Sequence, residues 1–503
     1  MYRHRKPICY SFVVLASLVL SGAGAQSREL FTTAPTTLRT DTAQTQRIDQ
    51  LRRRSTTQTL TLIRIDVDAL RENNVQITLP NDGTLNMSGQ ASDQRGPRDF
   101  TWIGSQQGVP NQATLVIHDG NVTGTINDGA NLYRIEPAGG GLHALIKVDR
   151  SHFPAEHPPS FKELERRSNI QLPPLRDLSR ADTPIGIDVL VAYTPSAAGA
   201  VGDMAATIQL AVAEANQSYE NSKINIRLNL VDSFQLAYTE GSNSFEKILA
   251  DFAGNTEVKN RRDASGADVA VLIINKSDYC GLANAIMANA NNAFAAVHYD
   301  CATGYYSFAH EIGHLQGARH DPANDSTNTP FSYGHGFQHT SPAPTWRTIM
   351  AYECSAVSCP RLKYWSNPSV MYNGAAMGTA TVNDNARVLN GTAATVAAFR
   401  SKPVVVGPVV GKAPLAFGTL SAAGQKSSGT NNWTSTYNAS YKRYEIAIVG
   451  ESYYYLNYAT NITPTGDIRY CRTDSVDNKL LVYCYDQNGA VQPARFAFGI
   501  YKQ

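Results

Sequence analysis

The stretch His310-Glu311-Ile312-Gly313-His314-Leu315-Gln316-Gly317-Ala318-Arg319-His320 carries histidine at its first, fifth and eleventh positions. Because residues four apart share one face of a helix, His310 and His314 are predicted to project side by side. Gly317 can adopt the positive φ that ends a helix and turns the chain back, which would bring His320 to the same point. Three imidazoles with a fourth position left for water form the ligand set of a catalytic zinc ion. An ordinary amphipathic helix is the alternative, but this combination of positions rarely arises by chance.

Glu311 follows the first histidine directly, so it leans away from the histidine row towards a water molecule on the metal. Three neutral imidazoles leave zinc its double positive charge, which lowers the pKa of such a water to about 7. Glu311 would accept the proton as the water attacks a peptide carbonyl and would then deliver it to the leaving amine. We therefore predict that Glu311 is the catalytic base and that His310, His314 and His320 bind one zinc ion.

Met350 stands thirty residues after His320, within the segment Thr348-Ile349-Met350-Ala351-Tyr352. With the long histidine motif and this methionine, the chain resembles the metzincin zinc endopeptidases. The resemblance implies an α/β catalytic domain with a twisted, mostly parallel sheet, a zinc helix and a Met-turn. Met350 would form a hydrophobic floor under the metal, and residues 281–287 would be the edge strand with which an extended peptide substrate pairs.

Tyr352 lies two residues after the methionine of this turn. In the astacin and serralysin branches of the family, a tyrosine at that place approaches zinc and can stabilise the developing oxyanion. The residue after the third histidine is Asp321, as in the reprolysin-like branch, where that tyrosine is usually absent. Tyr352 is therefore predicted either to assist catalysis or to form a wall of the pocket, and Asp321 to orient its neighbours by hydrogen bonds.

Residues 346–352 and 359–368 resemble bacterial reprolysin-like enzymes, and most closely the peptidyl-Asp metalloendopeptidase type, which cuts on the amino side of aspartate. A preference for an acidic residue requires a cation in the substrate pocket. Arg347, Arg361 and Lys363 flank the Met-turn and are the candidates, although basic side chains on a surface are often only solvated.

The amino-terminal residues have the pattern of a signal peptide, predicted to span residues 1–25. Basic residues precede an apolar run at residues 8–20, and small residues follow before Gln26. The whole sequence has 44 basic and 42 acidic residues, a net charge of +2. We therefore expect a secreted monomer with no nucleic-acid partner and no membrane anchor, acting on protein or peptide substrates.

Six cysteines remain after the predicted signal peptide, and an even number in an exported chain indicates disulfides. Pairing of nearest neighbours is the simplest hypothesis among the possible arrangements. It joins Cys280 to Cys301, Cys354 to Cys359, and Cys471 to Cys484.

The distribution of strand-like, helical and turn-forming segments along the chain predicts four parts: a β-rich propeptide (residues 26–181), a zinc protease domain (182–402), a linker (403–414) and a small C-terminal β-rich domain (415–503). We expect the last of these to be a β-sandwich. Within the protease domain we expect strands at Ile185–Tyr193, Ile224–Val231 and Asp268–Ile274, and helices at Ala197–Tyr219, Phe245–Phe252 and Asp384–Arg400. The Pro-rich, basic stretch from Phe153 to Arg180 would be the connector in which the precursor is cleaved.

The predicted propeptide contains no cysteine, so it cannot silence a zinc ion with a thiolate. A carboxylate, simple steric cover or a histidine such as His118, His143 or His152 would have to serve. The alternative is a permanent N-terminal binding domain.

Oxygen-bearing side chains follow the third histidine and predict a possible Ca²⁺ site: Asn324, Asp325 and Asn328. Such residues are also common in turns, which is the simpler explanation. For the whole chain, the competing hypothesis to a protease is a catalytically silent scaffold that acts as a secreted binding or adhesion protein.

Overall fold

The computed structural model describes residues 27–158, 183–402 and 414–502, apart from positions 36, 38, 73, 97, 107, 108, 456 and 466–469. The predicted signal peptide, most of the predicted connector and nearly all of the predicted linker lie outside the described residues. The chain divides into two compact units, Met1–Pro403 and Val404–Gln503. Among the helices of the described residues, none is long and apolar enough to span a membrane.

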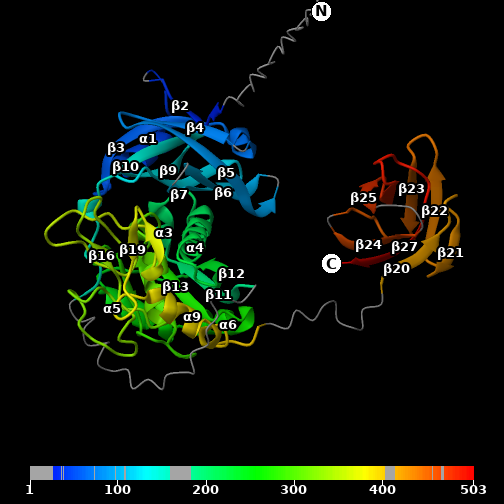
Figure 1. Ribbon diagram of the computed structural model, residues 1–503. Helices are drawn as coiled ribbons and strands as arrows, with labels where there is room; N and C mark the ends of the chain where they lie inside the picture. The colour runs from blue at the N-terminus through cyan, green and yellow to red at the C-terminus, as the bar shows by residue number, and fades with distance from the viewer. Residues whose placement is uncertain are drawn as a thin grey trace, which may run out of the picture. The chain divides into compact units, whose positions relative to one another are not determined.

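The N-terminal region, residues 27–158, is built on one ten-stranded sheet in the order β1-β4-β5-β6-β7-β8-β9-β10-β3-β2 (Figure 1). The strands are β1 (Arg28–Glu29), β2 (Phe31–Thr33), β3 (Thr57–Ile65), β4 (Asn74–Leu79), β5 (Gly83–Gly96), β6 (Asp99–Gln106), β7 (Val109–His118), β8 (Asn121–Asn127), β9 (Leu132–Gly139) and β10 (Leu142–Val148). Helix α1 (Thr42–Arg52) and the short 3-10 helices η1 (Val67–Arg71) and η2 (Arg150–His152) complete it. The region is β-rich, as its alternating sequence predicts.

The catalytic region, residues 183–402, contains a five-stranded sheet in the order β12-β11-β13-β15-β14. Its strands are β11 (Ile185–Tyr193), β12 (Ile226–Gln235), β13 (Val269–Ile274), β14 (Gly281–Ala283) and β15 (Phe294–His298). All pairs are parallel except the edge strand β14, which runs antiparallel to β15. The sheet is therefore mostly parallel, as expected.

Strand β13 shows why this sheet carries helices on both faces. Val269, Val271 and Ile273 point into one apolar core, while Ala270, Leu272 and Ile274 point into another. A strand buried on both faces reads as a continuous apolar run. The helices of the region are α3 (Pro195–Ala200), α4 (Met204–Asn221), α5 (Phe245–Gly254), α6 (Thr256–Ser265), α7 (Tyr299–Ala302), α8 (Ser307–Leu315) and α9 (Asn385–Val396). Short hairpins pair β16 (Gln338–His339) with β17 (Trp346–Arg347), and β18 (Asn367–Tyr372) with β19 (Ala375–Met377).

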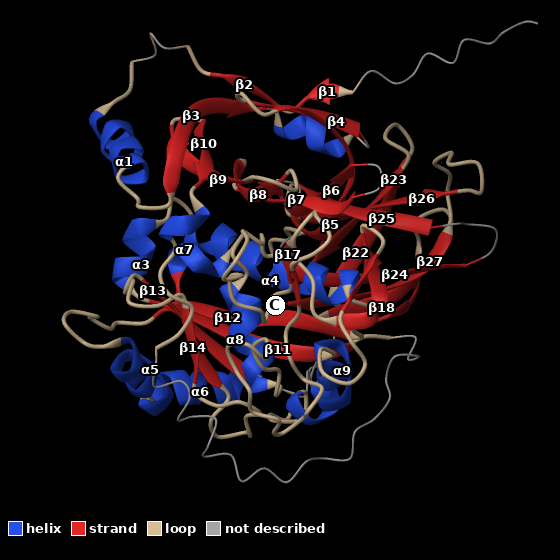
Figure 2. Cartoon of the chain, turned by 60° about the vertical axis from the view of Figure 1, so that its left-hand side comes forward, coloured by secondary structure: helices blue, strands red, loops and turns tan. Residues whose placement is uncertain are grey.

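Strand β12 and helix α9 differ from the expected Ile224–Val231 and Asp384–Arg400 only at their ends, but two other expected elements differ more. The single helix expected at Ala197–Tyr219 is split into α3 and α4, and the side chain of Asp203 caps α4 by accepting a hydrogen bond from the backbone of Ala206. A Cβ on Gly202, in the break, would lie 2.8 Å from the carbonyl oxygen of Pro137 in β9. The break between α3 and α4 thus allows β9 of the N-terminal region to lie close to the start of α4. Figure 2 shows its strands beside α4, on which Val116 of β7 packs.

The edge strand expected at residues 281–287 is only three residues long. The chain leaves the sheet after Ala283, and Met287 has a positive φ of 59°. The backbone N–H groups of Met287 and Ala288 instead donate to the carbonyls of His314 and Leu315 at the end of α8. Bonds to the zinc helix therefore replace the end of the strand.

The C-terminal unit consists of two four-stranded sheets, β21-β20-β27-β24 and β22-β23-β26-β25. Their strands are β20 (Ala416–Leu420), β21 (Lys426–Gly429), β22 (Trp433–Asn438), β23 (Arg443–Ile448), β24 (Tyr458–Thr465), β25 (Tyr470–Val476), β26 (Lys479–Tyr485) and β27 (Arg495–Lys502). Side chains from both sheets share one apolar core that includes Trp433, Tyr444 and Phe496. This is the arrangement of a small β-sandwich.

The three predicted disulfides are confirmed: Cys280–Cys301, Cys354–Cys359 and Cys471–Cys484. The first joins the start of β14 to α7, and the second closes a loop just after the Met-turn segment. Both therefore brace chain segments next to the histidine motif.

Candidate active site

Three buried imidazoles converge at the end of helix α8. The Nε2 atoms of His310 and His314 lie 3.0 Å apart, and Nε2 of His320 lies 3.2 and 3.0 Å from them. Gly317 has a φ of 100°, which is the left-handed turn that the sequence predicts, and it returns the chain so that His320 faces the helix. The geometry therefore brings together all three predicted ligands.

The hydrogen bonds of these imidazoles show that they suit a cation. Nδ1 of His310 lies 2.8 Å from the carbonyl oxygen of Ile349, and Nδ1 of His314 lies 2.9 Å from that of Ala318. Since a carbonyl only accepts, each Nδ1 carries the proton and each Nε2 directs a lone pair at the common point. Tetrahedral zinc with nitrogen ligands at 2.0–2.1 Å needs Nε2 atoms about 3.3 Å apart, so the spacing fits. Burial lowers the pKa of all three histidines well below the ordinary value, which keeps them neutral.

Glu311 is fully buried beside this cluster, close to the edge strand. Burial, followed by the negative charge of Glu156, raises the pKa of Glu311 well above its ordinary value. A Cβ at Gly281 of β14 would overlap the carboxylate of Glu311. Only glycine at this place lets the edge strand run so close to the predicted catalytic base.

Met350 is fully buried against the inner side of α8. A Cβ at Gly313, between the two helical histidines, would lie 3.1 Å from Sδ of Met350 and 2.6 Å from the ring of Trp365. The indole N–H of Trp365 is anchored by Ser218 of α4 at 2.8 Å. Gly313 and Trp365 thus support the helix from below, and the sequence motif alone did not identify Trp365.

A fourth histidine, His157, comes from the N-terminal region. The four imidazoles each offer one nitrogen within 4.8 Å of the others, and all four are buried. Nε2 of His157 lies 3.1 Å from Oε1 of Glu311, and Nδ1 lies 3.0 Å from the hydroxyl of Tyr352. Burial lowers the pKa of His157 to about 3, so it is neutral. Its ring covers the three-histidine cluster and contacts both predicted catalytic residues.

The three histidines suggested from the sequence as inhibitory groups lie elsewhere. His118 contacts Asp203, His143 accepts from the backbone of Val122, and the exposed His152 contacts Asp149. His118 thus contacts the cap of α4, while His143 and His152 bond within the N-terminal region, and none of the three belongs to the histidine cluster. The only sequence signal for His157 was its place near the start of the predicted connector, Phe153 to Arg180.

Asp321 holds the backbone of Tyr352 by a hydrogen bond, in keeping with the prediction that Asp321 orients its neighbours. Oδ2 of Asp321 accepts a hydrogen bond from the backbone N–H of Tyr352 at 2.9 Å. The phenol ring packs on His320 with its centroid 4.4 Å from that of the imidazole. The hydroxyl of Tyr352 is therefore held next to the cluster, while its role in catalysis stays a prediction.

Two of the three cations considered for an acidic preference lie together beside the cluster. Oε1 of Glu156 accepts hydrogen bonds from Arg347 at 3.1 Å, from Arg361 at 2.7 Å and from the hydroxyl of Tyr305 at 2.8 Å. Burial opposes the charge of Glu156, but the two arginines outweigh it and lower its pKa to about 2. Lys363 points elsewhere and donates to Thr114 of the N-terminal region at 2.8 Å, so it does not belong to this group.

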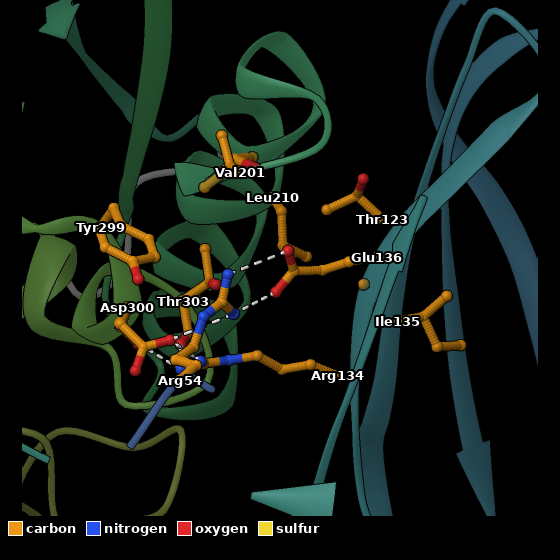
Figure 3. Close-up of a pocket in the computed structure, with 12 residues that line it drawn as sticks. Arg54, Thr123, Arg134, Ile135, Glu136, Val201, Leu210, Tyr299, Asp300 and Thr303 are labelled. Atoms are coloured by element: carbon orange, nitrogen blue, oxygen red, sulfur yellow. Dashed lines mark hydrogen bonds and ion pairs between the residues drawn. The ribbon is translucent and has the colours of Figure 1, made fainter. Parts of the chain in front are cut away.

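A buried ionic network holds the N-terminal region on the catalytic region (Figure 3). Asp300 of α7 is paired with Arg134 of β9 and with Arg54, and it accepts a hydrogen bond from Thr56 at 2.6 Å. Burial opposes ionisation of Asp300, but Arg134 and Arg54 lower its pKa to about 2. Glu136 of β9 pairs with both Arg54 and Arg47. Three guanidiniums therefore share two carboxylates. Separation of the two regions would take Asp300 away from both of its arginine partners, and an unpaired buried charge is costly, so the network favours the docked state.

The loop considered for calcium uses its polar groups internally. Asp325 pairs with the buried Arg319 at 2.9 Å, and the amide of Asn324 donates to Asp321 at 3.0 Å. These contacts stabilise the turn after the third histidine, and calcium stays a prediction.

Comparison with known proteins agrees with this geometry. Residues 184–366 match metallo-peptidase family M12. A peptidyl-Asp metalloendopeptidase of Xanthomonas campestris pv. campestris is 39% identical over 422 residues, which are 78% of this chain and 99% of that protein. One from Stenotrophomonas maltophilia (strain R551-3) is 46% identical over 318 residues, 61% of this chain and 75% of that protein. Among solved structures, metalloproteinase-II from Bacteroides fragilis aligns with a TM-score of 0.32 and 14% identity, covering 50% of this chain and 83% of that chain.

Proposed function

Because the chain belongs to the M12 metallopeptidases and is a relative of the peptidyl-Asp metalloendopeptidases, we propose that it is an exported zinc endopeptidase of the metzincin type. In this proposal it is made as an inactive precursor and cuts proteins beside aspartate. The observation that carries the proposal is the convergence of three neutral imidazoles with the carboxylate of Glu311. This complete set gives no support to a catalytically silent binding scaffold.

The residues of the site divide the chemistry between them. His310, His314 and His320 would hold zinc, which supplies an acidified water and polarises the peptide carbonyl. Glu311 accepts the proton of the attacking water and passes it to the leaving amine. Burial raises the pKa of Glu311, and the positive charge of a bound zinc ion would favour the ionised form that accepts the proton. Tyr352 would donate a hydrogen bond to the oxygen that gains negative charge.

We further propose that residues 26–181 are an inhibitory prosegment. Support comes from His157, whose ring covers the metal position and whose nitrogens contact Glu311 and Tyr352. Nothing can approach the metal from this side while His157 is in place. The ionic network around Asp300 supports the same reading because it binds the prosegment to the catalytic region through paired, buried charges.

Export is supported by the three disulfides, which form in oxidising compartments. A cut beside aspartate is supported by the names of the relatives and by the two buried arginines next to the cluster.

The proposal is tested by comparing the purified full-length chain with the same chain after cleavage in the connector. We expect casein hydrolysis only by the processed form, loss of activity with a zinc chelator, and recovery on addition of zinc. Equal specific activity of the two forms would contradict the inhibitory role of the prosegment. Hydrolysis that resists the chelator while zinc is absent would contradict the metal assignment.

A further inference from the structure

The carboxylate of Glu156 is bound as a ligand would be bound in a pocket. Two guanidinium groups and one phenol hydroxyl meet at its Oε1 atom, and the side chains of Arg347 and Arg361 are 1% and 2% exposed. Both guanidiniums also lie over the ring of Tyr305, with Arg361 4.4 Å from its centroid. These contacts define what we call the arginine pocket, formed by Arg347, Arg361 and Tyr305.

Backbone hydrogen bonds of the prosegment place the residue in the arginine pocket directly before the residue that covers the metal position. The carbonyl of Ala155 accepts a hydrogen bond from the N–H of Cys280 at 2.7 Å, and that of Glu156 accepts from Gly281 at 3.3 Å. The prosegment therefore pairs with the segment that leads into β14, through one isolated parallel bridge between Ala155 and Tyr279, at the sheet edge where an extended peptide could add. Glu156 enters the arginine pocket and the next residue, His157, covers the metal position.

We propose that the arginine pocket binds the acidic side chain of the substrate residue next to the scissile bond, and that Glu156 fills this pocket in the precursor as a mimic of that side chain. This inference rests on the proposed endopeptidase function and names the residues of its specificity.

Hydrogen bonds within the catalytic region also hold the two arginines. Arg347 donates to the backbone carbonyls of Ala351 and Cys359, and Arg361 donates to those of Tyr305 and Ala351. All of these acceptors belong to the catalytic region, although Nη1 of Arg347 and Nη2 of Arg361 each bind Glu156 as well as the carbonyl of Ala351. Such fixed, planar donors match a carboxylate better than a flexible ammonium group does.

Charge explains why an acid is preferred to its amide. In the precursor the two arginines face the carboxylates of Glu156 and of the half-exposed Glu353, which lies 3.1 Å from Arg347. Once the prosegment leaves, one carboxylate remains for two buried cations, and an unpaired buried charge is costly. A substrate aspartate restores the balance, whereas an asparagine cannot.

The inference is tested with enzyme activated from the full-length chain and with peptide sets that differ only by Asp, Asn or Ala after the scissile bond. We expect Arg361→Gln to lower kcat/KM for the Asp peptide about 10- to 100-fold, in keeping with the loss of a charge-assisted hydrogen bond, and to leave the Asn peptide nearly unchanged. Tyr305→Phe keeps both arginines and removes only a hydroxyl, so it should give the same pattern with a smaller loss. Arg261→Gln, on the exposed side of α6, is the matched control and should behave as the unaltered enzyme.

A second measurement does not depend on proteolysis. In the zymogen, Glu156→Gln and Arg361→Gln should each lower Tm, and the double substitution should lower it by less than the sum, because both remove one interaction. Additive losses in Tm, or an undiminished Asp-over-Asn preference in Arg361→Gln and Tyr305→Phe, would overturn the pocket assignment. Unaltered enzyme that hydrolyses no peptide would instead contradict the proposed endopeptidase function, and the Tm cycle would still decide whether Glu156 and Arg361 are coupled.

Discussion

Nε2 of His157 lies 3.1 Å from Oε1 of Glu311, so a residue of the N-terminal region contacts the group that the chemistry needs as a base. Both side chains are almost completely buried, and the same imidazole contacts the hydroxyl of Tyr352 through its other nitrogen. One side chain therefore engages the base and the candidate oxyanion donor and covers the metal position. This relationship links the fold of the precursor to the control of its activity.

Substitution of this histidine should weaken inhibition while the prosegment stays attached. We expect His157→Ala to raise hydrolysis by the uncleaved precursor about 10- to 100-fold, because the loss of its hydrogen bonds favours the open state of the site. The rate at which a chelator removes zinc from the precursor should rise as well. His152→Ala is the matched control, because that exposed histidine contacts only the neighbouring segment. Unchanged hydrolysis and unchanged zinc release in His157→Ala would show that the prosegment inhibits by other contacts.

Docking of the prosegment should weaken in acid. The pKa of Asp300 is about 2 in the docked state, since Arg134 and Arg54 outweigh its burial, and an exposed aspartate has a pKa of about 3.9. A group whose pKa is lower in the docked state stabilises docking above pH 4 and loses that effect as the pH falls from about 4 to 2. Dissociation of the precursor nicked in its connector should therefore increase with acidity, and Asp300→Asn should flatten the dependence. A dissociation constant that falls as the pH is lowered would contradict this assignment.

Removal of one predicted ligand should abolish metal binding as well as activity. In His314→Ala, two histidines of the catalytic region remain, which is too few for a stable zinc site. We expect less than one tenth of the normal zinc content in the processed enzyme, measured by elemental analysis. A zinc content near one per chain in this variant would exclude His314 from the ligand set.

The substitution Tyr352→Phe distinguishes the two predicted roles of Tyr352, as a donor that assists catalysis or as a wall of the pocket. Loss of one donor to a developing oxyanion should lower kcat about 10- to 100-fold, with little change in KM or zinc content. The ring would still pack on His320, as it does in the unaltered chain. A kcat equal to that of the unaltered enzyme would leave Tyr352 as a wall only.

Local sequence patterns predicted the parts of the site that depend on local geometry. The spacing of His310 and His314 is a property of one helix, and the left-handed Gly317 is a property of one turn, so both could be inferred without the fold. Strand β11 has the residues that its apolar run predicts, and the cysteine pairs are close in sequence.

The remaining features depend on contacts between segments far apart in the chain. His157 reaches the cluster because Phe153 stacks on Tyr305 at 4.2 Å and because Glu156 enters the arginine pocket, neither of which leaves a local pattern. The break between α3 and α4 likewise arises where Gly202 meets β9. Lys363 lies close in sequence to Arg361 but contacts another region, so proximity along the chain did not identify the members of the pocket.

The most direct test of the central claim is the zinc content and turnover of Glu311→Gln in the processed enzyme. The three histidines hold the metal and the amide keeps the shape of the side chain, so zinc should stay at one ion per chain and the thermal stability should be preserved. Turnover should fall by at least the contribution of general-base catalysis, about 10²–10⁴-fold, because the attacking water loses its proton acceptor. Near-normal peptide hydrolysis by Glu311→Gln with zinc fully bound would contradict the account.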